Sequence, residues 1–229
     1  MFQSLGALLE AFLYGAVVYG LYALIFLLST HALSLSPFQD RLSGGHGTIF
    51  CLSTLLSTPP AILLILFISG GTKESIQTTL GLYAISLKET SFACLLALLL
   101  FGIYQSLSVS LCGGSVPDPV IRLFHATKPE ALFYGAMLIA APLFEEGFFR
   151  GFLFHFFKRS PVGETGAVIS TAIIWSLGHL QYEMWEMGIL FFIGIVLALF
   201  RVWGKSLYPA LLFHLILNMG TSLELSFFY

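Results

Sequence analysis

The chain has 229 residues, of which 57% are hydrophobic and only 10% are charged, and its mean hydropathy is +0.91. An ordinary soluble domain carries about 25% charged residues, so water is not the main solvent of this protein. The formal net charge of -2, without a basic tail or stripe, lacks the electrostatic footprint that nucleic-acid binding requires. Composition therefore predicts an integral membrane protein and excludes nucleic acid as its partner.

Apolar stretches recur along the whole chain, and a transmembrane helix needs about 20 mostly apolar residues. Windows that approach this length cover residues 7–29, 48–70, 91–112, 130–157, 164–182, 186–204 and 207–223. We therefore expect an all-α fold, a polytopic bundle of about seven transmembrane helices with a polar site inside the membrane. Residues 1–229 should form a single integral membrane domain, in which 1–126 hold the first three spans and 127–223 the motif-bearing helices. The expected location is the plasma or inner membrane if the source is bacterial.

The fourth window has the clearest beginning. Thr127 can cap a helix that has Pro129 and Glu130 in its first turn. A helix of about 28 residues is about 42 Å long, more than the ~30 Å hydrocarbon core, so we expect it to tilt or to project beyond the core. Within it, Gly147 and Gly151 form a small-xxx-small face that lets another helix approach closely.

Three charged residues lie in the interior of this fourth window: Glu145, Glu146 and Arg150. A charge within a span costs about 2.5–3.5 kcal/mol, so each is a candidate functional residue. Glu146 and Arg150 are four residues apart on one helical face, and an ion pair between them would offset their desolvation. Glu145 is rotated by about 100° from Glu146 and lacks that partner, which makes it a candidate general base. The alternative is a purely structural polar knot between helices.

Two later windows carry histidines. The fifth window contains Trp175 and His179, and the seventh contains His214 with Asn218 one turn later on the same face. A lone histidine on an apolar helix is more often a packed core residue than a catalyst. Two of them on separate spans, in a chain that also has the double glutamate, favour a shared polar site.

In chain order these segments resemble the motifs of the CAAX-protease and bacteriocin-processing membrane family, also called the ABI family. That family is marked by Glu-Glu-x-x-x-Arg, then Phe-x-x-x-His, then His-x-x-x-Asn on successive helices. The corresponding segments here are residues 145–150, 175–179 and 214–218, and the resemblance covers roughly residues 127–220. Trp175 stands where the family has Phe. An aromatic wall is kept, so this departure concerns the shape of the site more than its chemistry.

The resemblance implies an intramembrane glutamate endopeptidase, similar to type II CAAX prenyl endopeptidases, that uses no metal or other cofactor. Glu145, helped by His179, would activate a water for attack on a peptide carbonyl, and His214 and Asn218 would donate hydrogen bonds to the oxyanion. The partners implied are the lipid bilayer and a membrane-associated or lipidated peptide or protein substrate. The other motif residues would be structural or would position the substrate: Glu146, Arg150 and Trp175.

Three other functions compete with this one. Two histidines and a glutamate are a plausible zinc ligand set, although the chain has no His-Glu-x-x-His and the ligands would come from three helices. A non-catalytic membrane scaffold or bacteriocin-immunity protein would keep the same fold, and the filled motifs argue against it. A proton-coupled transporter would use intramembrane carboxylates as relays, but the sequence shows no pair of interrupted, repeat-related helices. The zinc enzyme and the scaffold remain open alternatives.

Overall fold

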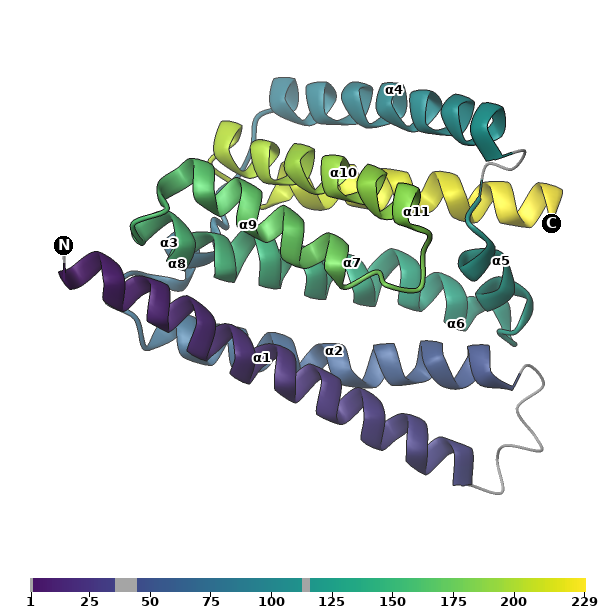
Figure 1. The fold of residues 1–229 in the computed structure, drawn as a ribbon, viewed down its shortest axis with the longest axis horizontal. Helices are drawn as coiled ribbons and strands as arrows, with labels where there is room; N and C mark the ends of the chain where they lie inside the picture. The colour runs from purple at the N-terminus through teal and green to yellow at the C-terminus, as the bar shows by residue number, and fades with distance from the viewer. Residues whose placement is uncertain (1, 36–44, 113–115) are drawn as a thin grey trace.

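The computed structural model describes residues 2–35, 45–112 and 116–229, and this part of the chain consists of helices joined by turns and loops, without strands (Figure 1). The predicted all-α fold is confirmed. The helices before the motifs are α1 (Phe2–Leu35), α2 (His46–Gly70), α3 (Ile76–Leu80), α4 (Leu87–Cys112) and α5 (Asp118–His125). The remaining segments are α6 (Glu130–Gly135), η1 (Ala136–Ala140), α7 (Ala141–Glu145), η2 (Glu146–Leu153), α8 (Phe154–Arg159), α9 (Gly163–Leu177), α10 (Met184–Trp203) and α11 (Tyr208–Phe228).

Within the described residues, six helices are long and apolar enough to cross a membrane, and they match six of the seven predicted windows. The fifth window holds α9, whose 15 residues reach only about 22 Å, short of the ~30 Å hydrocarbon core. The prediction of about seven spans thus corresponds to six long helices and one short one. The predicted continuation of this window to residue 182 is wrong, because α9 ends at Leu177 and Gly178 follows as its C-cap.

Residues 130–159 form one continuous helix, here called the motif helix, in which the π-helical segments η1 and η2 alternate with α-helical ones. Pro142 explains the first π segment. Its ring clashes with the carbonyl four residues earlier in a regular α-helix, and it has no N–H to donate. In η1 the Ala141 N–H donates to the Ala136 carbonyl, five residues earlier, so one extra residue is accommodated just before the proline.

The beginning of the motif helix differs from the prediction. Pro129 is the N-cap, and no side chain caps the first turn. The hydroxyl of Thr127 instead donates a hydrogen bond of 2.6 Å to the carbonyl of Leu123, four residues earlier at the end of α5. The predicted cap by Thr127 is therefore wrong, because the preceding helix α5 competes for the same side chain.

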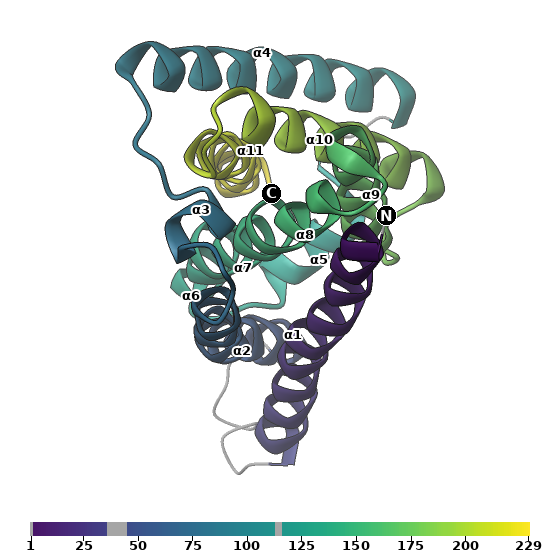
Figure 2. The same cartoon turned by 90° about the vertical axis from the view of Figure 1, so that its left-hand side faces the viewer.

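The motif helix lies in the middle of the molecule. In both views α1 and α2 lie on one side of it, α10 and α11 lie on the other, and α4 is outermost (Figures 1 and 2). Half of its most apolar window is buried inside the protein, against 17% for α1 and for α4. Its charged residues are consequently enclosed by other helices, whereas α1 and α4 present mostly apolar side chains to the surroundings.

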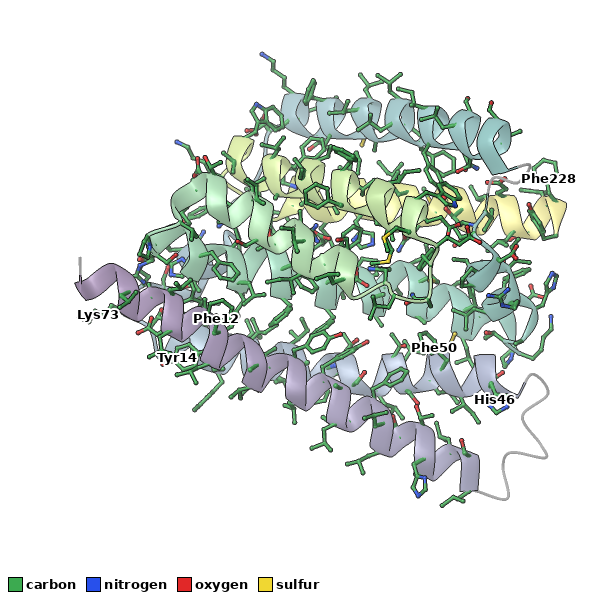
Figure 3. The ribbon with its side chains drawn as sticks, viewed as in Figure 1. Phe12, Tyr14, His46, Phe50, Lys73 and Phe228 are labelled. Carbon is green, nitrogen blue, oxygen red and sulfur yellow. The ribbon has the colours of Figure 1, made fainter. Side chains whose placement is uncertain are left out.

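The close approach predicted for the small residues of the motif helix is confirmed. A Cβ added at Gly147 would lie 3.4 Å from Ile62 of α2, and one added at Gly151 would lie 3.3 Å from the Leu80 side chain of α3. The first helix packs on the motif helix through aromatic rings, with Tyr22 stacked on Phe144 at a centroid distance of 3.9 Å. Phe12, which is labelled in Figure 3, meets Phe157 edge to face at a centroid distance of 5.8 Å. These contacts hold the motif helix against α1, α2 and α3.

Candidate active site

A buried ion pair lies at the centre of the motif helix. The guanidinium of Arg150 donates from Nη1 to Glu146 Oε1 at 3.2 Å, and both side chains are 0% exposed. Arg150 also donates from Nη2 to the carbonyl of Gly194 in α10 at 3.2 Å, and its guanidinium carbon lies 4.8 Å from the centroid of the Trp175 ring. The predicted pairing is confirmed, and it ties the motif helix to α9 and α10.

Glu146 has a second partner that the sequence did not indicate. The Nδ1 atom of His214, on α11, lies 2.8 Å from the same Oε1 atom that accepts from Arg150. His214 is buried as well, with 8% of its side chain exposed. The other carboxylate oxygen of Glu146, Oε2, is buried and has no hydrogen-bond partner among the described residues. One oxygen of Glu146 therefore joins two cationic or potentially cationic groups.

Glu145 faces a different set of groups, as the rotation between adjacent helical residues requires. It is partly exposed, and its carboxylate accepts a hydrogen bond from the indole Nε1 of Trp175. Trp175 comes from α9, and the same side chain is 4% exposed. The two adjacent glutamates thus have distinct environments. Glu146 pairs with a guanidinium, whereas the one hydrogen-bond donor that the structure shows for Glu145 is a neutral indole.

His179 lies in the turn just after α9. Its Nδ1 is 2.8 Å from the carbonyl of Trp175, and its ring is 4.9 Å from the Trp175 ring. A carbonyl only accepts hydrogen bonds, so this contact assigns the proton of the neutral imidazole to Nδ1 and leaves the lone pair on Nε2. The ring of Tyr182 also lies close to His179, with ring centroids 5.7 Å apart.

Trp175 is the point at which the motif-bearing segments meet. Its indole bonds to Glu145, and its ring contacts His179 and, at 5.9 Å and 82°, His214. The structure therefore brings Glu145, His179 and His214 to one aromatic side chain, from three different parts of the chain. Their catalytic roles remain predictions.

Asn218 is bonded differently. Its Nδ2 donates a hydrogen bond of 2.8 Å to the backbone carbonyl of Met137 in η1. In the π pattern that carbonyl would accept from residue 142, which is a proline without an N–H, and the Ala141 N–H is already bonded to Ala136. Asn218 thus supplies a donor that the backbone lacks. The sequence signal for this contact is Pro142 inside an apolar helix, because a freed carbonyl in a membrane needs another donor.

The residues that the structure describes include no group of three or more His, Cys, Asp or Glu side chains placed to hold a metal ion. His214 and Glu146 contact each other, but His179 uses its Nδ1 on a backbone carbonyl. The zinc alternative therefore has no preformed three-ligand cluster in the described part of the chain.

Comparison with protein families gives one match. Residues 127–220 match the model of a family described as Type II CAAX prenyl endopeptidase Rce1-like. The matched range contains the whole motif helix, α9 and α10, together with the part of α11 that holds His214 and Asn218. No curated protein and no solved structure matches the chain.

Proposed function

We propose that this chain is an intramembrane endopeptidase in which Glu145 and His179 activate a water, because residues 127–220 match the model of the family described as Type II CAAX prenyl endopeptidase Rce1-like. The family match supports a membrane-embedded CAAX-type protease domain. The roles of Glu145 and His179 are supported by the arrangement of side chains around Trp175. Glu145, which forms no ion pair within the described part of the chain, and His179, whose Nε2 carries the lone pair in the neutral ring, both contact this one side chain.

The proposed reaction is hydrolysis of a peptide bond. Glu145 takes a proton from a water that His179 Nε2 helps to orient, and the water oxygen attacks the peptide carbonyl. The oxyanion that forms needs hydrogen-bond donors aimed at it. When the tetrahedral intermediate collapses, the C–N bond breaks and the proton held by Glu145 passes to the leaving amine. The base therefore returns to its starting state after each turnover.

The substrate class follows from the location of the site. Glu145, Glu146 and Arg150 lie in a helix that is long and apolar enough to span the membrane. A peptide bond reaches such a site only if its chain is anchored in or at the bilayer. We therefore propose a membrane-associated or lipidated peptide or protein as the substrate.

Comparative peptidomics of membranes tests this proposal. Cells that express the wild-type chain are compared with cells that express Glu145→Gln, which keeps the size of the side chain but removes its basicity. Glu130→Gln serves as the matched control, because Glu130 lies on the same helix with 48% of its side chain exposed. We expect cleavage products in the wild type and the control that are nearly absent with Glu145→Gln. Identical peptide patterns in all three, with equal amounts of folded protein, would refute the proposal.

Glu145→Gln also distinguishes the proposed endopeptidase from a non-catalytic scaffold, and metal analysis distinguishes it from a zinc enzyme. A non-catalytic scaffold keeps its full cellular function with Glu145→Gln, whereas an endopeptidase loses it. A zinc enzyme also loses activity, so the purified wild type is treated with a strong chelator and its metal content is measured. Metal-free protein that cleaves normally supports the glutamate mechanism. If the protein contains stoichiometric zinc, and activity falls on chelation and returns on zinc addition, the glutamate mechanism is wrong and a zinc mechanism takes its place.

A further inference from the structure

The two histidines of the site differ in what their Nδ1 atoms contact. His179 is bonded to a neutral backbone carbonyl, and His214 is bonded to the Glu146 carboxylate. Both acceptors fix the orientation of the imidazole, as outer partners of functional histidines commonly do. They do not have the same effect on charge, because only the carboxylate attracts a proton on the ring.

The pairing of Glu146 with Arg150 decides which way the hydrogen bond to His214 runs. A carboxylate held by a guanidinium stays ionised, and an ionised carboxylate can only accept. His214 must therefore carry a hydrogen on Nδ1. In its neutral form it would then have a lone pair on Nε2 and could not donate from that atom. It can donate to an oxyanion from Nε2 only as an imidazolium.

We propose that Glu146 is a positioning residue that holds His214 as an imidazolium, whose Nε2–H is the donor to the developing oxyanion. This inference rests on the proposed function and assigns Glu146 a role that the motif alone leaves as structural. No bond to the substrate is formed by Glu146 itself. It acts through His214, in the way that a buried carboxylate orients and stabilises the histidine of a catalytic triad.

The charges around His214 support this assignment. The ionisable groups that act on it are Glu146, Glu145 and Arg150, all from the motif helix. The side chain of Trp175, from α9, faces it with an uncharged ring, and the α10 carbonyl nearby is occupied by Arg150. Of the two carboxylates, Glu146 is bonded to His214 at 2.8 Å, whereas Glu145 acts on it only at longer range. The attraction of Glu146 for a proton on the ring is therefore the stronger one.

The geometry of the Glu146 carboxylate points the same way. Pairs between arginine and a carboxylate are frequently bidentate, with both oxygens bonded to the guanidinium. Here Oε1 accepts from both Arg150 and His214, while Oε2 of Glu146 and Nε of Arg150 are buried without partners among the described residues. Leaving such atoms unpaired is costly. The Glu146–Arg150 pair therefore forms fewer hydrogen bonds than it could, while Oε1 of Glu146 is shared with His214.

Nitrogen-15 NMR of the full chain in lipid nanodiscs tests the proposal without a substrate. The protein is labelled at histidine, and the His214 signals are identified by their loss in His214→Gln. At pH 7 we expect both ring nitrogens of His214 to have imidazolium shifts. We expect His179 to show the neutral tautomer with hydrogen on Nδ1. A neutral His214 in the wild type would overturn the inference.

A double variant tests whether Glu146 is responsible for the charge on His214. Glu146→Gln with Arg150→Gln removes both members of the ion pair, so no uncompensated charge is left buried. We expect His214 to become neutral in this variant and to stay an imidazolium in Glu145→Gln, where the bond to Glu146 is kept. An unchanged imidazolium in the double variant would refute the role of Glu146. If the double variant does not fold, the wild-type spectrum still decides the charge of His214. The spectrum of Glu146→Gln alone then shows whether Glu146 is responsible for that charge.

The two proposals fail in different ways. If the spectra match expectation and no peptide depends on Glu145, the inference on His214 holds and the proposed endopeptidase function is wrong. If the peptides depend on Glu145 and His214 is neutral, the function holds, and His214 does not act as a charged donor.

Discussion

The Asn218 side chain donates a hydrogen bond of 2.8 Å to the carbonyl of Met137, and this is the carbonyl that Pro142 leaves without a backbone donor. The contact joins α11 to the motif helix at its first π segment. A second polar side chain acts nearby, because Thr58 of α2 donates to the carbonyl of Ala140 at 3.4 Å. The irregular part of the motif helix is thus stabilised by neighbours on two sides, which membrane interiors require of any freed backbone group.

We predict that Asn218→Ala lowers the free energy of unfolding by about 1–3 kcal/mol, because the Met137 carbonyl loses its donor. Thermal unfolding of the purified protein in detergent measures this. Turnover reports separately on a catalytic role, since the loss of an oxyanion donor reduces it by about 10²–10³. Unchanged stability with a loss of turnover would show that Asn218 acts on the substrate alone.

A double-mutant cycle gives the matched control for this prediction. Pro142→Ala restores an N–H at position 142, which can serve the Met137 carbonyl directly. We expect Asn218→Ala to be less destabilising in the Pro142→Ala background than in the wild type. An equal loss of stability in both backgrounds would contradict the link between Asn218 and the proline.

Arg150→Ala should reduce the amount of folded protein in the membrane. The change leaves the buried Glu146 carboxylate with His214 as its one bonded partner among the described residues, and the loss of one member of a buried ion pair costs about 3–5 kcal/mol. Lys128→Ala is the control. Its pair with Glu130 is about half exposed, at 45% and 48%, and such pairs contribute about 0–1 kcal/mol. An Arg150→Ala protein that accumulates and melts like the wild type but lacks activity would show that Arg150 binds substrate or takes part in catalysis.

Trp175→Phe and Trp175→Ala separate the two contributions of this side chain. The phenylalanine keeps an aromatic ring beside His179, His214 and Arg150 but loses the N–H that bonds Glu145, so we expect a loss of about 1.5–3 kcal/mol. The alanine also leaves a cavity, which raises the expected loss to about 3–5 kcal/mol. The free energy of unfolding of each variant is measured by circular dichroism, because this signal does not depend on tryptophan fluorescence. Equal losses in the two variants would mean that ring packing contributes little.

The sequence predicted those features that depend on local periodicity. Apolar length located the helices, and the four-residue spacing placed Glu146 beside Arg150 and turned Glu145 away from it. These predictions required no knowledge of how the helices pack. The order of the motifs predicted that Glu145, His179, His214 and Asn218 share one site. The structure shows the first three around one indole, whereas Asn218 donates to the Met137 carbonyl, and the catalytic roles stay predictions.

Other features depend on packing and on competition between hydrogen bonds. The contact between His214 and Glu146 requires a particular rotation of α11 about its axis, which a pattern of histidine and asparagine does not specify. The prediction that Thr127 caps the motif helix was wrong, because its hydroxyl donates to the carbonyl of Leu123 in α5. His179 was predicted to lie on a helix, but it lies beyond the end of α9, where its ring bonds the Trp175 carbonyl that also accepts from the Gly178 N–H.

Gly194→Ala tests whether the close approach of α9 and α10 supports the site. A Cβ at Gly194 would lie 3.1 Å from both Cα and Cβ of Ala172 and 3.2 Å from the Trp175 ring. Ala172 is fully buried, so its backbone can move away only if α9 shifts as a whole. Such a shift would carry Trp175 with it and disturb its contact with the Arg150 guanidinium, whose carbon lies 4.8 Å from the centre of the Trp175 ring. We expect a loss of about 1–3 kcal/mol in stability, as overpacking of a core produces.

Gly188→Ala is the matched control for this substitution. Gly188 lies on the same helix, and a Cβ there would meet nothing within 4 Å. Alanine is favoured over glycine in helices by about 0.8–1.0 kcal/mol, so this variant should melt at or above the wild-type temperature. Adding Ala172→Gly to Gly194→Ala removes one of the close contacts and should restore part of the lost stability. If Gly194→Ala melts like Gly188→Ala and yields the same Glu145-dependent peptides, the spacing of α9 and α10 at this point does not hold Trp175 in place.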